Sequence, residues 1–255
     1  MQKILPFVVA LFVATAFSSI AQDQQYEEDV FPTSEGDLII TFLRHSTMMF
    51  TFNDLVIHVD PWSRAADYSQ LPKGDIVLLT HEHGDHLDRR ALAQVIKDTT
   101  SFYSEYDETT LIYTKICSDR FPGGTVMRNG MTWDVKGINI EAVPNYCLIP
   151  RDHPSSQPHT QWECNGYILT FGDKRVYVVS ETENIPELRN IEDIDIALLP
   201  MDGVFNLTPE EAVDVVNVFK PRVIYPIHYS QADLTPFIEA FENNPDIEVR
   251  IRNMP

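Results

Sequence analysis

Residues 80–86 hold the highest density of chemically reactive side chains in the chain, with the sequence THEHGDH. Imidazoles stand at His81, His83 and His86, and carboxylates stand at Glu82 and Asp85. The segment directly follows residues 75–79, an apolar run that is typical of a strand covered on both faces. Imidazole nitrogens and carboxylate oxygens are ligands for borderline divalent metals such as zinc. The sequence therefore predicts a metal site at the end of a buried strand.

The spacing within this segment favours two metals rather than one. Side chains alternate along an extended segment, so we expect His81 and His83 to point one way, and Asp85 and His86 another. Two adjacent metals lower the pKa of a shared water toward about 7, which makes a metal-bound hydroxide available for hydrolysis. Asp85 is the candidate catalytic residue, because it is placed both to ligate a metal and to accept a proton.

The spacing of His81, His83, Asp85 and His86 resembles the H-x-H-x-D-H signature of the metallo-β-lactamase superfamily. The resemblance covers nearly the whole chain after residue 21 and is closest to L-ascorbate-6-phosphate lactonase-like hydrolases. Five further segments support it: RHS at 44–46, HVDPW at 58–62, EAVP at 141–144, TPEEA at 208–212 and PIHY at 226–229. The resemblance implies an α/β fold of the four-layer αββα type with two divalent metal ions. Zinc is the expected metal, with manganese and iron as alternatives.

The same resemblance implies how the ligands divide between the two metals. His81 and His83 would hold one metal with a third histidine, while Asp85, His86 and His228 hold the other. The third histidine is His153 or His159, and His153 is preferred because Pro154 follows it, as is common in this branch.

Further site residues also follow from the resemblance. The family places Gly-Asp-Thr after the strand at 176–179, and its Asp bridges the metals, but this chain has Ser180-Glu181-Thr182. Glu181 is expected to bridge instead, with a backbone shift to absorb its extra methylene. Asp60 would orient a ligand histidine through its free ring nitrogen, and His45 would face the cleft and contact substrate.

Three other side chains near these segments have less specific interpretations. His58 lies inside a predicted strand and is expected to pack. Cys147 lies near the uncertain third histidine, where a thiolate could bind zinc, but we interpret it as a buried, inert thiol. With Cys117 and Cys164 it makes three cysteines, so the fold does not depend on a disulfide framework.

Hydrophobic patterning predicts two blocks of strands, each followed by helices. In the first block, a turn at 53–54 joins two of the strands, and Asp88 caps a helix at 89–97. Residues 98–108 are left unassigned. In the second block, TPEE at 208–211 begins a helix to 219, and another helix spans 235–241. Such an order predicts two packed sheets covered by helices. The expected strands are 38–43, 47–52, 55–59, 75–79, 131–135, 138–143, 165–171, 175–179, 195–199, 223–227 and 247–251.

The N-terminus has the features of a secretory signal. A lysine at position 3, an apolar run over 4–17 and small residues before Ala21 predict cleavage near Ala21, so the mature protein would be periplasmic or secreted. The run is too short for a stable membrane anchor. Residues 22–36 are interpreted as a flexible lead-in, and residues 37–255 as one hydrolase domain.

The formal net charge of −19 makes nucleic acid an unlikely partner, because a polyphosphate would be repelled over most of the surface. A small molecule with an ester, lactone or phosphodiester-type bond is the expected substrate. Two alternatives remain open: an iron-dependent oxygenase on the same fold, or a metal-binding protein whose catalytic site has decayed, as the Ser180-Glu181 departure would allow. No oligomeric state follows from the sequence.

Overall fold

The structure, a computed structural model, describes residues 26–97, 108–147 and 159–255. The predicted signal at 1–21 and the preferred ligand His153 lie outside the described residues.

The first half of the chain forms a seven-stranded sheet whose strands follow one another in sequence order. β1 to β4 are antiparallel, and β4 to β7 are parallel. The turn between β3 and β4 is at Asn53 and Asp54, as predicted, and both residues have positive φ. The strands are β1 (Glu27–Thr33), β2 (Gly36–Arg44), β3 (Thr47–Phe52), β4 (Leu55–Val59), β5 (Ile76–Leu78), β6 (Thr110–Tyr113) and β7 (Thr125–Val126).

The second half forms another seven-stranded sheet in sequence order. β8 to β11 are antiparallel, and β11 to β14 are parallel. The strands are β8 (Thr132–Val135), β9 (Ile138–Cys147), β10 (His159–Phe171), β11 (Lys174–Val178), β12 (Ile196–Pro200), β13 (Val223–Ile227) and β14 (Glu248–Val249).

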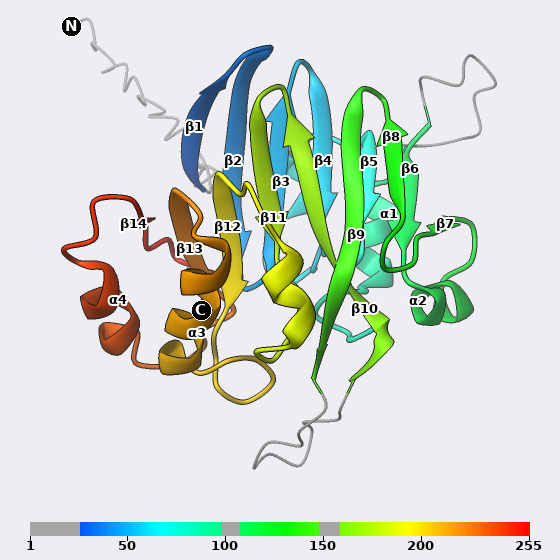
Figure 1. Ribbon diagram of the computed structural model, residues 1–255. Helices are drawn as coiled ribbons and strands as arrows, with labels where there is room; N and C mark the ends of the chain where they lie inside the picture. Colours follow the sequence, from blue (N-terminus) through cyan, green and yellow to red (C-terminus); the bar gives the residue numbers. More distant parts are fainter. Residues whose placement is uncertain (1–25, 98–107, 148–158) are drawn as a thin grey trace, which may run out of the picture.

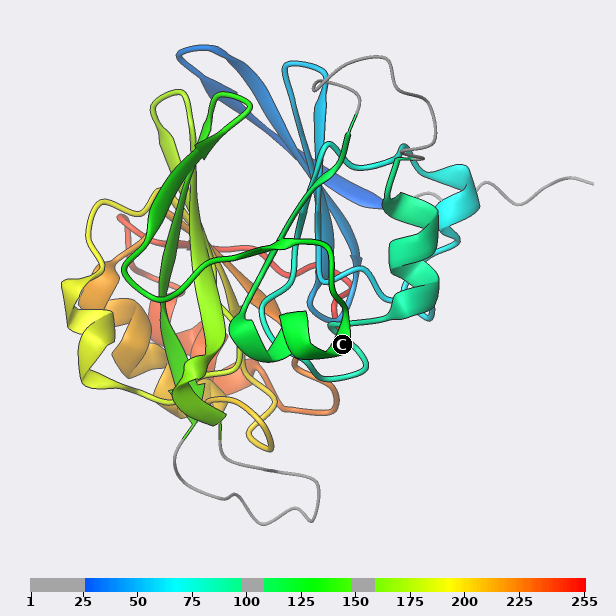
Figure 2. The same cartoon turned by 90° about the vertical axis from the view of Figure 1, so that its right-hand side faces the viewer.

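The sheets face each other, and helices cover their outer faces (Figure 2). The first sheet packs against the 3-10 helix η1 (Tyr68–Gln70), α1 (Arg89–Val95) and α2 (Lys115–Arg120). The second packs against η2 (Pro186–Asn190), α3 (Pro209–Phe219) and α4 (Thr235–Phe241). The predicted αββα sandwich is therefore confirmed (Figure 1). Among the described residues, no helix has the length and apolar character needed to cross a membrane.

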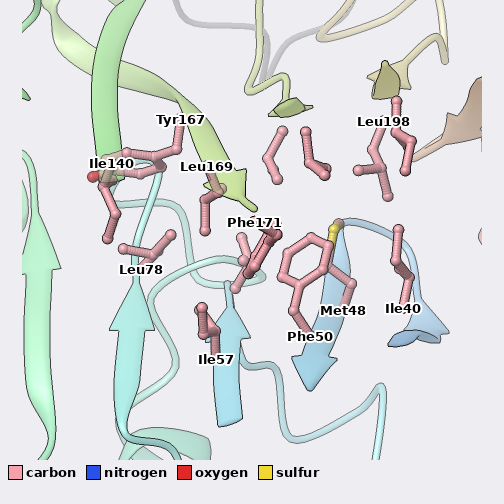
Figure 3. Close-up of a cluster of buried hydrophobic side chains, with 14 of the residues drawn as sticks. Ile40, Met48, Phe50, Ile57, Leu78, Ile140, Tyr167, Leu169, Phe171 and Leu198 are labelled. Carbon is pink, nitrogen blue, oxygen red and sulfur yellow. The ribbon is translucent and has the colours of Figure 1, made fainter. Parts of the chain in front are cut away.

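Apolar side chains from both sheets form the central core (Figure 3). Ile40 and Phe50 of the first sheet and Leu169 and Phe171 of the second are almost completely buried. The rings of Phe50 and Phe171 lie 5.7 Å apart across the interface. Burying such side chains contributes roughly 1.5–3 kcal/mol each, which holds the two halves together.

Local capping explains where two helices begin. Asp88 accepts hydrogen bonds from the backbone nitrogens of Arg90 and Ala91, so α1 begins at residue 89 as predicted. Thr208 and Glu211 form the expected capping box of α3.

The prediction of a flexible lead-in at 22–36 is wrong for residues 27–33, which form β1. This strand pairs antiparallel with β2 along its whole length. Its sequence EEDVFPT does not alternate apolar and polar residues, which is the signal that predicts a strand. An edge strand can do without this pattern, because its side chains are mostly exposed or half-buried. The folded domain therefore includes residues that precede the boundary predicted at residue 37. β6 and α2 were also not anticipated.

Candidate metal centre

The candidate site residues gather where strands end. His45 follows β2, Asp60 follows β4, and residues 80–86 follow β5. In the second sheet, Glu181 follows β11 and His228 follows β13. Because the carboxyl ends of parallel strands share one edge of a sheet, residues distant in sequence converge there.

The first cluster contains three histidines and one glutamate. The ligand atoms of His81, His83, His159 and Glu181 all lie within 4.8 Å of one another. Glu181 is central: its Oε1 lies 3.4 Å from His81 Nε2 and 3.3 Å from His83 Nδ1, and its Oε2 lies 3.3 Å from His159 Nδ1. Among the described residues, the third histidine of this cluster is His159, one of the two that the sequence offered; His153 lies outside them.

The second cluster contains His45, Asp85, His86 and His228, whose ligand atoms also lie within 4.8 Å of one another. Asp85 Oδ2 lies 3.1 Å from His45 Nε2, 3.9 Å from His86 Nε2 and 4.0 Å from His228 Nε2. The rings of His81 and His86 are 3.9 Å apart, so the two clusters adjoin. The structure therefore places His45 among candidate ligands rather than only beside substrate.

Carboxylates lie behind two of these histidines. Asp60 Oδ2 is 2.7 Å from His86 Nδ1 and also accepts a hydrogen bond from Thr80 Oγ1. Asp202 Oδ2 is 3.0 Å from His228 Nδ1. In both cases Nδ1 faces the carboxylate, so Nε2 would be the atom that binds a cation.

Asp202 was missed in the sequence. Its Oδ1 also accepts hydrogen bonds from the backbone nitrogens of residues 204, 205 and 206, which fixes the loop after β12. The signal was present, because Asp202 lies just past the buried strand β12, much as Asp60 follows β4.

Glu181 is positioned by a buried amide. Asn145 Oδ1 accepts a hydrogen bond from the backbone nitrogen of Ser180, and its Nδ2 donates to the Tyr177 hydroxyl. A Cβ at Gly166 would lie 2.2 Å from Asn145 Oδ1, so only glycine leaves room for this amide. The turn carrying Glu181 is therefore held by the neighbouring strands.

Three site residues have left-handed backbone conformations: His45 (φ 62°), Asp60 (φ 44°) and His228 (φ 45°). Such conformations cost about 1–3 kcal/mol each and persist where their surroundings hold them. Here the backbone nitrogen of His228 donates to the carbonyl of His45 at 3.1 Å, so the two strained residues fix each other across the sheets.

The charge states suit metal binding in the first cluster. Burial lowers the pKa of His81 to about 3, which keeps its imidazole neutral. Burial opposes ionisation of Glu181, but His81 and His83 hold its pKa well below the usual range. Neutral imidazoles and an ionised carboxylate are the forms that bind a metal.

In the second cluster, burial and neighbouring charges leave His86 protonated, and a bound metal would take the place of this proton. Burial disfavours the charged form of His86, but Asp60 raises its pKa to about 9. Burial likewise opposes ionisation of Asp85, yet the hydrogen bond from His45 and the nearby imidazoles hold its pKa far below the ordinary value.

Unsatisfied buried nitrogens show that the residues fit a metal. His81 Nε2, His86 Nε2, His159 Nδ1 and His228 Nε2 are buried and have no hydrogen-bond partner among the described residues. Leaving such atoms unpaired costs about 1–3 kcal/mol each. Divalent cations in both clusters would satisfy all four.

The remaining candidates lie outside these clusters. Cys147 is buried, and its Sγ donates to the Phe205 carbonyl at 3.2 Å; it belongs to neither candidate ligand group. No disulfide joins the three cysteines. His58 is fully buried and lies 2.9 Å from the Pro72 carbonyl, in keeping with a packing role.

Known proteins show the same architecture. The β-lactamase superfamily domain matches residues 39–228. A UPF0173 metal-dependent hydrolase of Thermus thermophilus is 28% identical over 201 residues, which is 75% of this chain and 83% of the relative. A crystal structure described as a metal-dependent hydrolase of Parabacteroides distasonis is 36% identical, with a TM-score of 0.80, and the match covers 91% of this chain and all of that one.

A more distant structure shares the fold alone. Igni18, a metallo hydrolase of Ignicoccus hospitalis, is 20% identical with a TM-score of 0.66, over 84% of this chain and 94% of that one. Since the domain match spans well over half of the sequence, the chain belongs to the metallo-β-lactamase superfamily.

Proposed function

We propose that the protein is a dinuclear metal-dependent hydrolase that cleaves an ester, lactone or phosphodiester-type bond in a small molecule. One observation carries the proposal: two adjoining groups of four ligand residues direct unsatisfied buried nitrogens toward their own centres. The names of the relatives from Thermus and Parabacteroides agree with the reaction class.

The proposal assigns His81, His83, His159 and Glu181 to one metal, and His45, Asp85, His86 and His228 to the other. Two divalent cations, with zinc as the first candidate, would polarise the substrate oxygen and acidify a bound water. Both carboxylate oxygens of Glu181 lie near the imidazoles of the first cluster, so Glu181 would hold the first metal, and the family resemblance is what makes it the candidate bridge. Asp60 and Asp202 hold His86 and His228 in the tautomer that presents Nε2.

Asp85 is the candidate for handling the proton of the attacking water. Its side chain is 33% exposed, whereas those of His86 and His228 are nearly buried, so it lies at the mouth of the second cluster. His45 Nε2, which would coordinate the same metal, lies 3.1 Å from Asp85 Oδ2. An ionised carboxylate in this place can accept a hydrogen bond from a water and direct its lone pair toward substrate.

A metal count and a hydrolysis screen test the proposal together. We expect two divalent ions per chain by elemental analysis, and metal-dependent hydrolysis of at least one of the lactone, ester, β-lactam and phosphodiester probes. Asp85→Asn should reduce kcat by roughly 10²–10⁴-fold when its metal content is restored. The control Asp119→Asn, at an exposed carboxylate, should leave kcat unchanged.

The other outcomes identify the rivals. One iron per chain with oxygen-dependent turnover would favour the oxygenase. Absence of metal binding at micromolar concentrations would favour a decayed site. Near-wild-type activity of fully metallated Asp85→Asn would remove Asp85 from the chemistry.

A further inference from the structure

A pocket of about 580 Å³ opens directly beside the candidate metal centre. Its lining includes the metal-site residue Asp85 and three arginines, Arg64, Arg89 and Arg90. All three arginines are exposed to solvent. In a chain of net charge −19, three guanidinium groups around one pocket form a local region of opposite sign.

The carboxylates of the pocket are already engaged. Asp88 Oδ1 accepts from the backbone nitrogens of Arg90 and Ala91, and its Oδ2 accepts from both the backbone nitrogen and the hydroxyl of Ser63. Asp85 Oδ2 faces His45. Neither acid therefore serves as a partner for the arginine side chains.

Two of the arginines remain available for a ligand. Arg89 Nη2 donates to the Arg120 carbonyl. The guanidinium groups of Arg64 and Arg90 have no acidic partner among the residues that the structure describes, and Arg64 lies over the Trp62 ring at 5.9 Å from its centroid.

Trp62 connects the arginines with the metal centre. The centroid of its ring lies 5.3 Å from that of His45, a member of the second ligand cluster. One side of the indole thus neighbours the candidate metal site, and Arg64 lies over its ring. A substrate could place its scissile bond at the metals, its carbon chain against Trp62 and an anionic group at the arginines.

We infer that this pocket is an anion subsite, and that the substrate is an ester carrying a carboxylate group away from the scissile bond. Arg64 and Arg90 bind the anionic group, while Trp62 packs on the intervening carbon chain. Guanidinium groups match carboxylates and phosphates in geometry as well as charge. The inference rests on the proposed hydrolase function.

Matched ester pairs test the subsite. Each 4-nitrophenyl monoester of succinate, glutarate or adipate is compared with the neutral ester of equal chain length, in which a methyl group replaces the free carboxylate. We expect the best anionic ester to have a kcat/KM at least about tenfold above its neutral match, since hydrogen bonds between charged groups exceed neutral ones. Arg64→Gln/Arg90→Gln should remove this preference through KM, with the neutral ester unaffected.

Arg222→Gln is the control for the loss of an arginine elsewhere on the surface, because it removes one positive charge at an exposed residue just before β13, whereas His228 follows the other end of that strand. It should retain the preference for the anionic ester. Equal kcat/KM values for charged and neutral esters, with no effect of the double variant, would overturn the subsite and leave the hydrolase proposal standing.

A binding measurement separates failure of the subsite from failure of the hydrolase proposal. Calorimetry on the metal-loaded protein compares the diacids succinate, glutarate and adipate with the monoacids of equal length. We expect the best diacid to bind at least about tenfold more tightly, and the double variant to lose that difference. If no ester is hydrolysed but this difference is present, the subsite stands without the hydrolase; if diacids and monoacids bind alike, the subsite is overturned.

Discussion

Asp60 and Asp202 act on the second ligand cluster in the same way, although they come from different sheets. Each follows a buried parallel strand, and each faces Nδ1 of a histidine whose Nε2 points into the cluster. The family resemblance predicts the role of Asp60, whereas the role of Asp202 becomes visible only when the loop after β12 is seen to fold back toward His228. A carboxylate in this position fixes the tautomer of the ligand and raises its basicity.

Replacing Asp202 should therefore weaken metal binding without unfolding the loop. In Asp202→Asn, the amide oxygen can still accept from the backbone nitrogens of 204–206, but the amide NH₂ would face the nitrogen of His228 that must donate. We expect the affinity for one of the two metals to fall about 10–100-fold in competition with a chromogenic chelator. Asp214→Asn, at an exposed position of α3, is the control. Equal affinities would show that Asp202 serves the loop alone.

At the scale of elements, β1 is tied to residues 250–252, which follow the last strand of the other sheet. Asp29 of β1 receives two hydrogen bonds of 2.6 Å from Arg252 Nη2 and lies 3.4 Å from Arg250 Nη1. The Tyr225 hydroxyl of β13 also donates to Asp29. An edge strand without a hydrophobic face is thus held by charge pairing between the two halves.

Removing the charge of Asp29 should destabilise the fold in a pH-dependent way. Burial opposes its ionisation, but Arg252 and Tyr225 hold the pKa of Asp29 below its ordinary value of 3.8. The stabilisation is therefore present above about pH 4, and it is lost as pH falls through the lower folded pKa. In urea unfolding at pH 7, Asp29→Asn should lower the free energy of unfolding by about 1–3 kcal/mol.

Acid conditions supply the second half of that test. The difference between wild type and Asp29→Asn should shrink as the pH falls below about 4, because the carboxylate becomes neutral in both states. Glu35→Gln, an exposed acid near the same strand, should match wild type at every pH. If the difference in unfolding free energy between wild type and Asp29→Asn were independent of pH, the shape of the Asp29 side chain rather than its charge would hold β1.

For the whole molecule, the candidate metal centre is a place where the two halves meet. Each ligand cluster draws residues from both: His81 and His83 follow β5 of the first sheet, whereas His159 and Glu181 belong to the second. In the other cluster, His228 from the second sheet meets Asp85 and His86 from the first. Cations that bind the folded state only must therefore stabilise the assembly of the sheets.

Chelation should lower the melting temperature reversibly. Free metal at 100 times its dissociation constant stabilises by about 2.7 kcal/mol, which corresponds to roughly 5–10 °C for a chain of this size. Differential scanning calorimetry with and without a chelator, followed by metal re-addition, measures the shift. His228→Gln should show a smaller shift than wild type. Identical melting temperatures with and without chelator would contradict a metal that joins the two halves.

The sequence by itself predicted most of the elements and the first candidate ligands. Alternating and continuous apolar runs, the turn at Asn53-Asp54 and the capping box at Thr208 identify most of the strands and helices, because these signals are local. The spacing of His81, His83, Asp85 and His86 is a local signal too, and the structure places all four in the two candidate ligand groups. The signal peptide and export remain predictions, since residues 1–21 lie outside the described chain.

Only the tertiary structure decided which distant residues meet. β1 carries no hydrophobic pattern, and its place depends on pairing with β2 and on Arg252. His159 joins His81 because β10 begins at the edge where β5 and β11 end. His45 and Asp202 follow β2 and β12, and only the packing of the two sheets brings both beside His228. Strand propensity depends on residues that are neighbours in the sequence. A ligand cluster or a charged pocket depends on which distant segments meet, and the packing of the whole fold decides that.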